Sequence, residues 1–218
     1  MIAALRPARY DPSERAADRW IHFAGLGVGA TGLAVLLGIA ARSATPAIFI
    51  ASLIYSASLM AMLVCSTLYH HSPWAYRKFP RRLDHAAIFL LIAGTYTPFT
   101  VCRLHGTAAF VMTATVWAGA LGGVAAKLVG PLRSRGFSTA GYLALGWIAL
   151  VGLRPILDAV DPLPLILILA GGVIYSIGAG IHRWRSLRFH NAIWHGMVVI
   201  AAECHFAAVL LGVVLAPR

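Results

Sequence analysis

The sequence predicts an all-α integral membrane protein with seven transmembrane helices, the N-terminus in the cytoplasm and the C-terminus outside. The first observation is composition: 60% of the 218 residues are hydrophobic, 11% are charged, and the mean hydropathy is +0.79. Soluble domains carry about 25% charged residues, so an ordinary soluble protein is excluded. The second observation is a series of apolar stretches, and the third is an uneven distribution of Lys and Arg between them.

Seven apolar stretches are candidates for membrane spans. A helix of about 20 residues crosses the bilayer core, and each span must be helical because an open strand would leave backbone groups unpaired in lipid. The stretch at 137–153 is at the short end and could extend at either side. In chain order the stretches are 20–41, 47–70, 84–102, 107–126, 137–153, 163–181 and 190–215.

Residues 1–19 precede the first stretch and are predicted to form a basic cytoplasmic segment. Seven of the first 20 residues are charged and none belongs to an apolar run, so no cleavable signal peptide is expected. Residues 20–216 then form a single seven-helix transmembrane domain. Its glycines, such as Gly25 and Gly29, favour close helix packing in lipid. The three cysteines show no CxxC spacing, which argues against a disulfide framework or a zinc finger.

The distribution of basic residues orients the chain, because Lys and Arg are enriched in cytoplasmic loops. With a cytoplasmic N-terminus, the inner segments hold Arg6, Arg9, Arg15, Arg19, Arg77, Lys78, Arg81, Arg82, Lys127, Arg133, Arg135, Arg183, Arg185 and Arg188. The outer segments hold Arg42, Arg103, Arg154 and Arg218. This basic excess is a topology signal, so membrane lipids are the expected partners and nucleic acid is not.

Polar residues within the spans gather at one membrane depth. Ser66 and His70 lie four apart at the end of the second span, so they share a helix face. Asp84 opens the third span, while Asn191 and His195 lie in the first turns of the seventh. In the deduced topology all five are near the cytoplasmic surface. Ionisable groups within spans usually face the bundle interior and serve function, so these residues predict a site there.

The segments that carry these residues read "STLYH", "LDHAAIFLLIAGTYTP" and "AIWHGMVVIAAECHF". Together they resemble the signature blocks of the hemolysin III family, which belongs with the progestin and adiponectin receptors and, more distantly, the alkaline ceramidases. The resemblance implies a seven-helix fold with a zinc site at the cytoplasmic face. The family pattern, Ser-x-x-x-His, Asp and His-x-x-x-His, matches here at Ser66, His70, Asp84 and His195. Its remaining histidine falls on Asn191.

His70 and His195 are therefore the expected zinc ligands, and the third group is open between Asn191, His190 and Asp84. An amide oxygen is a poor match for zinc beside imidazole. His190 points about 140° away from His195 on an ideal helix, so it serves only if the helix begins after it. His205 is excluded as a partner of His195, since ten residues of helix separate them by about 15 Å.

The expected function is hydrolysis of a lipid amide or ester, a class that rests on the resemblance. Zinc lowers the pKa of a bound water to about 7; Asp84 would orient that water and move its proton, and Ser66 would donate a hydrogen bond. The alternative is a non-enzymatic lipid or ligand sensor, or a pore or transporter. Composition suggests a bacterial inner membrane, and nothing in the sequence indicates an oligomeric state.

Overall fold

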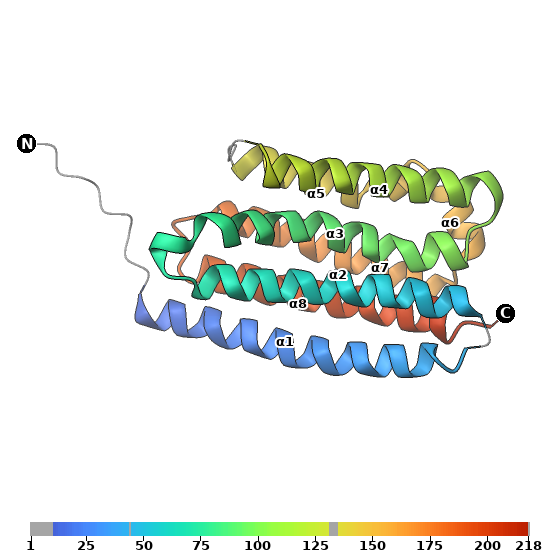
Figure 1. Ribbon diagram of the computed structural model, residues 1–218, viewed down its shortest axis with the longest axis horizontal. Helices are drawn as coiled ribbons and strands as arrows, with labels where there is room; N and C mark the ends of the chain where they lie inside the picture. The colour runs from blue at the N-terminus through green and yellow to red at the C-terminus, as the bar shows by residue number, and fades with distance from the viewer. Residues whose placement is uncertain (1–10, 44, 131–134, 218) are drawn as a thin grey trace, which may run out of the picture.

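The computed structural model describes residues 11–43, 45–130 and 135–217, and over these residues it is helical with no strand (Figure 1). The eight α-helices are α1 (Pro12–Ala40), α2 (Pro46–His71), α3 (Lys78–Cys102), α4 (Gly106–Leu128), α5 (Arg135–Gly146), α6 (Leu153–Ala159), α7 (Pro162–Arg183) and α8 (His190–Val209). Short 3-10 turns lie at Trp74–Tyr76 and Ile148–Leu150, and a π-helical turn, Leu210–Val214, continues α8. The basic residues Arg6, Arg9, Arg133 and Arg218 lie outside the described residues.

Six of these helices are long and apolar enough to cross a membrane, and a bent pair makes a seventh span if it is counted as one. The pair joins Thr139–Leu150 to Leu153–Ala159 with a bend of 60°. This bent pair replaces the short span expected at 137–153. Gly152 caps the second helix of the pair, and glycine is a poor helix former, so the chain breaks there instead of continuing.

Helix α1 begins at Pro12, eight residues before the first apolar stretch expected from hydropathy. Its start is fixed by capping. The backbone N–H of Ser13 donates to the Asp11 carboxylate at 3.1 Å, and the Asp11 N–H donates to Glu14 at 3.2 Å. Such a reciprocal capping box, with proline in the first turn, is a strong helix start. Residues 12–19 are therefore part of the first helix.

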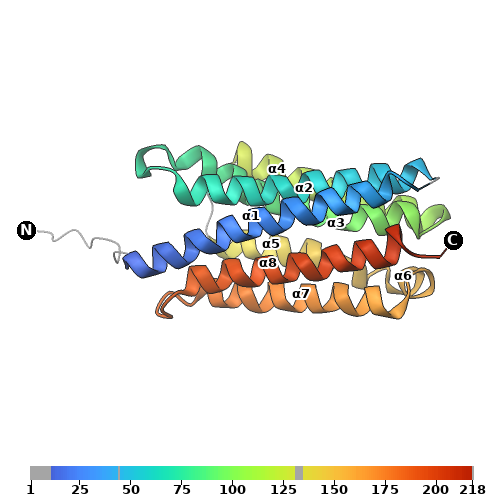
Figure 2. The ribbon, with the colours of Figure 1, turned by 90° about the horizontal axis from the view of Figure 1, so that it is seen from below.

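The long helices run roughly parallel to one another in a bundle (Figures 1 and 2). α2 packs on α3, α3 on α4, and α7 on α8, while α1 crosses both α2 and α8. Some contacts require a residue without a side chain: a Cβ on Gly94 of α3 would lie 1.9 Å from the Ser58 hydroxyl oxygen of α2. Close helix packing at small residues is typical of membrane proteins, as the sequence predicts.

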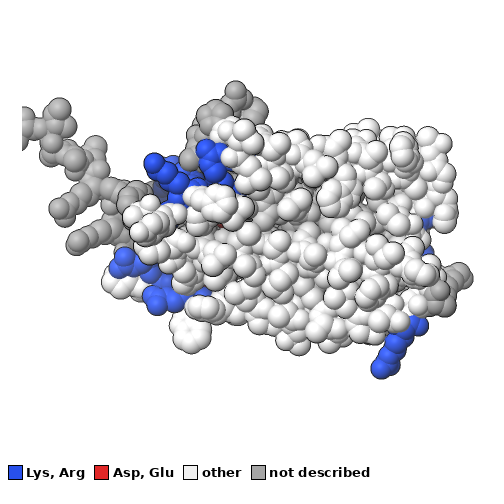
Figure 3. Space-filling model, in the orientation of Figure 1, with Lys and Arg blue, Asp and Glu red and all other residues white. Residues whose placement is uncertain are grey.

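Lys and Arg side chains gather at the end of the bundle where α1 begins, and few lie at the opposite end (Figure 3). We call this the basic end; α1, α3 and α8 begin there, and α2 and α7 finish there. The positive-inside rule places the basic end in the cytoplasm, as the sequence predicts. These five helices thus bring their termini together where the polar residues of the spans are concentrated.

Candidate metal centre

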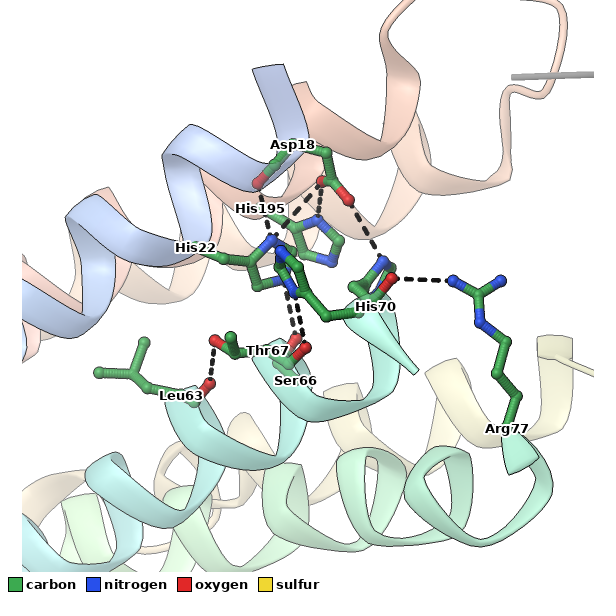
Figure 4. A network of polar contacts seen from close by, with 9 residues as sticks. Asp18, His22, Leu63, Ser66, Thr67, His70, Arg77 and His195 are labelled. Atoms are coloured by element: carbon green, nitrogen blue, oxygen red, sulfur yellow. Dashed lines mark hydrogen bonds and ion pairs between the residues drawn. The ribbon is translucent and has the colours of Figure 1, made fainter. Parts of the chain in front are cut away.

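Four side chains from three helices meet just inside the basic end. They are Asp18 and His22 of α1, His70 of α2 and His195 of α8 (Figure 4). One candidate ligand atom from each lies within 4.8 Å of those from the other three. His22 and His195 are buried, and Asp18 and His70 are half-buried. These residue types, brought together away from solvent, could hold a metal ion.

The Asp18 carboxylate is the centre of the group. One of its oxygens lies 2.5 Å from His195 Nδ1, and the other lies 3.2 Å from His70 Nδ1. The His70 and His195 rings approach each other to 4.4 Å between centroids. A carboxylate thus joins α1 to two histidines that are 125 residues apart in the sequence.

His22 lies on the same face of α1, one turn after Asp18. Its Nδ1 lies 2.7 Å from the Asp18 backbone oxygen, and its Nε2 lies 3.3 Å from the Ser66 hydroxyl oxygen. Because a carbonyl oxygen only accepts, Nδ1 carries the proton in this contact. Both ring nitrogens of His22 therefore have hydrogen-bond partners, which is not so for the described contacts of His70 and His195.

Ser66 and Asp84, the catalytic pair expected from the sequence, lie beside this group. Ser66 is buried on α2, and its hydroxyl oxygen lies 3.3 Å from His22 Nε2, while Asp84 lines the cavity beside His70. The two helices are brought together by the tight α2–α3 packing. The hydroxyl of Ser66 thus joins α2 to His22 of α1.

His190, another candidate for the third ligand, is not a member of the four-residue group. α8 begins at His190, directly after Phe189 in the left-handed conformation. The helix therefore includes His190, whose Nδ1 lies 3.2 Å from the Leu187 backbone oxygen. Asn191 lines a cavity beside the group.

The two α1 residues were not found from the sequence, although their spacing is the signal that identifies them. Asp18 and His22 are four apart, as two groups on one helix face should be. The hydropathy boundary at residue 20 separated them, since it placed Asp18 in a loop segment and His22 in a span. The capping residues Asp11, Pro12 and Glu14 are what extend the helix over Asp18.

A cavity of about 960 Å³ opens from the group into the bundle. At the basic end it is lined by Asp18, His70, Asp84 and His195, and further in by Leu91, Trp147, Ser176 and His205. Its volume is at the upper end of the range for small-molecule sites. A long molecule inside it would have one end at the four-residue group.

The model of the family described as haemolysin-III related matches residues 13–206. The chain belongs to this family. It is 35% identical to Hemolysin-3 of Bacillus cereus over 199 residues, which cover 90% of each chain. It is 32% identical to a Hemolysin-3 homolog of Bacillus subtilis over 205 residues, 94% of this chain and 96% of the relative.

A more distant relative is the human monocyte to macrophage differentiation factor, 26% identical over 166 residues, 72% of this chain and 67% of the relative. The resemblance inferred from the sequence is confirmed, and with it the integral membrane fold built from helices.

Proposed function

We propose that this protein is a zinc-dependent hydrolase of a lipid amide or ester in the bacterial inner membrane. The observation that carries the proposal is the convergence of Asp18, His22, His70 and His195 at one end of a large cavity, beside Ser66 and Asp84. Zinc binds imidazole nitrogen and carboxylate oxygen, so the group has suitable donors. Relatives from two Bacillus species support the bacterial location.

Asp18, His70 and His195 are the proposed ligands. A catalytic zinc site keeps three protein ligands and an open position for water. His22 is the member left out, because both of its nitrogens already have hydrogen-bond partners. In this arrangement α1 provides the third ligand that Asn191 does not, and His22 holds the Asp18 turn and Ser66 in place.

Zinc bound there would polarise the substrate carbonyl and acidify a water. Asp84 lines the cavity and would act as the general base. It accepts a proton from the water while the oxygen of that water attacks the carbonyl carbon. The carbon–nitrogen or carbon–oxygen bond then breaks, and Asp84 returns the proton to the leaving amine or alcohol. Ser66 hydrogen-bonds to His22 and is a positioning residue. The products are a carboxylic acid and an amine or alcohol.

The proposal is tested by measuring zinc content and acid release from N-acyl amides and acyl esters with purified protein. Asp84→Asn should keep zinc and lose activity by about 10²–10⁴-fold, the usual contribution of a general base. Asp158→Asn, a change of the same chemistry at an exposed position on α6, should change neither. If wild-type protein binds zinc but releases no more acid than His195→Ala, the hydrolase proposal fails and a binding protein on the same fold is favoured.

A further inference from the structure

The inner half of the cavity contains polar side chains that face an otherwise apolar membrane interior. Most have partners within the protein. The hydroxyls of Thr95, Tyr96 and Ser176 donate to backbone oxygens at 2.7–2.8 Å, and the Trp147 ring N–H donates to Ser176 at 3.1 Å. These groups are therefore satisfied without a ligand.

His205 differs from them. Its Nε2 lies 3.2 Å from the Ile168 backbone oxygen, so Nε2 carries the proton and Nδ1 is a hydrogen-bond acceptor. Within the described residues, no hydrogen-bond partner of Nδ1 is found. Because His205 lines the cavity, a ligand in the cavity can supply the missing donor.

The fold holds the His205 ring in this position. A Cβ on Gly171 of α7 would lie 2.4 Å from the ring, so the glycine makes the space for it. The Tyr175 ring packs at 5.5 Å between centroids. With one edge against α7 and bonded to its backbone, the imidazole has little freedom to turn Nδ1 elsewhere.

An acceptor left unpaired in a membrane interior is costly, since lipid offers no donor. The depth of His205 in the membrane indicates which group could donate a hydrogen bond to Nδ1. His205 lies ten residues after His195 on α8, about 15 Å along the helix axis. In an extended hydrocarbon chain each ~1.5 Å carbon–carbon bond advances only about 1.25 Å along the chain axis because of the tetrahedral bond angle, so on the order of 12 carbons span that length.

We propose that the cavity binds an amphiphile whose hydrocarbon chain carries a hydroxyl group, and that this hydroxyl donates to His205 Nδ1. The inference rests on the proposed function, because it assumes that the polar head of the amphiphile lies at the four-residue group. It adds that the substrate is an acyl chain hydroxylated about 15 Å from its carbonyl, measured by the His195–His205 separation.

The test compares dodecanoic acid with ω-hydroxydodecanoic acid, as competitors of a labelled dodecanoic acid on zinc-loaded protein. In wild-type protein the hydroxylated acid should bind at least as tightly, because His205 replaces the water that its hydroxyl loses. In His205→Leu the ratio of the two dissociation constants should move by roughly tenfold against the hydroxylated acid, the value of one hydrogen bond.

Two further variants complete the test. His205→Gln keeps an acceptor and should restore part of the preference. Tyr175→Phe removes a hydroxyl at the same depth that is also without a partner among the described residues; its oxygen is enclosed by protein, so the preference should not change.

The outcomes separate this inference from the function on which it rests. If the labelled acid shows no saturable binding that unlabelled dodecanoic acid displaces, the cavity does not bind acyl chains and the proposed function fails. If both bind and the ratio is the same in wild type and His205→Leu, or wild type rejects the hydroxylated acid a hundredfold, an ordered water satisfies His205 and this inference alone is wrong.

Discussion

The first turns of α1 and α8 lie side by side at the basic end and have the same design with different residues. Each presents two polar side chains four positions apart: Asp18 and His22 on α1, Asn191 and His195 on α8. On α1 the first residue reaches the centre of the group, and on α8 the second does. Together the two turns bring a carboxylate and an imidazole to 2.5 Å.

In the proposed site, a neighbouring helix supplies the third ligand instead of the helix that carries it in the family pattern. A metal site needs a ligand atom at a given position, whichever helix carries it. Helix α1 crosses α8 closely enough to supply one. The family pattern expects an imidazole at position 191. The carboxylate at position 18 takes over that role in our proposal.

The largest expected effect is a difference in zinc affinity between variants of His195 and of Asn191, the two α8 residues. His195→Ala should lower zinc affinity roughly a hundredfold, since one ligand of a site worth about 10–16 kcal/mol contributes about 3 kcal/mol. Asn191→Ala should change the affinity less than about threefold, because Asn191 is not a proposed ligand. Competition with a fluorescent zinc chelator measures both. Equal losses in the two variants would show that Asn191 also binds the ion.

The second largest effect is expected for variants that transfer the third ligand from α1 to α8. Asp18→Asn should lower zinc affinity about 10–100-fold, because the amide oxygen is a weaker donor and carries no charge. Adding Asn191→His to that variant should recover most of the loss, since the new imidazole lies one turn before His195. The same chelator competition measures the single and double variants.

Asn191→His alone is the control for the exchange, and it should bind zinc at least as tightly as wild type. A double variant no better than Asp18→Asn would contradict the exchange. In that case a side chain at position 191 would not reach the metal, and the Asp18 carboxylate would not be the replacement for the histidine of the family pattern.

Much of the fold could be predicted from the sequence, because lipid imposes a simple rule on each span. Six of the seven expected stretches correspond to helices long enough to cross a membrane. The rule fails where a helix begins or ends for a reason other than hydropathy. The Asp11–Glu14 capping box starts α1 within a polar segment, and Gly152 breaks the fifth span within an apolar one.

The candidate site was predicted in part for a related reason. His70, His195, Ser66 and Asp84 were found from spacing and depth, which are properties of single helices. The part played by Asp18 depends on how α1 crosses α8, a tertiary contact that no local pattern records. Helix boundaries drawn from hydropathy also divided Asp18 from His22, so the one local signal for this turn was lost.

The smallest expected effect concerns how the two turns are attached to each other. Glu14 of α1 accepts a hydrogen bond from the Phe189 backbone N–H at the start of α8, at 2.8 Å. Nearby, Arg188 lies 3.2 Å from the Asp11 carboxylate, with both side chains exposed. Exposed ion pairs contribute little, so Arg188→Ala should shift the thermal unfolding midpoint only slightly and leave zinc affinity unchanged.

The effect of pH on this pair has a definite sign. The pKa of Asp11 is lowered from its ordinary value of 3.8, mainly by the hydrogen bond from the Ser13 backbone N–H and to a lesser extent by Arg188. A carboxyl whose pKa is depressed by folding contributes stability that is present above 3.8 and is lost as the pH falls through its folded value.

The difference between wild type and Arg188→Ala should therefore be visible at neutral pH and vanish in acid. Arg185→Ala, at another exposed arginine of the same loop, should show no such dependence. Because Ser13 is the larger cause, Asp11→Ala should shift the midpoint more than Arg188→Ala does. If Arg188→Ala instead weakens zinc binding as much as Asp18→Asn, the surface pair, and not Glu14, sets the crossing of α1 over α8.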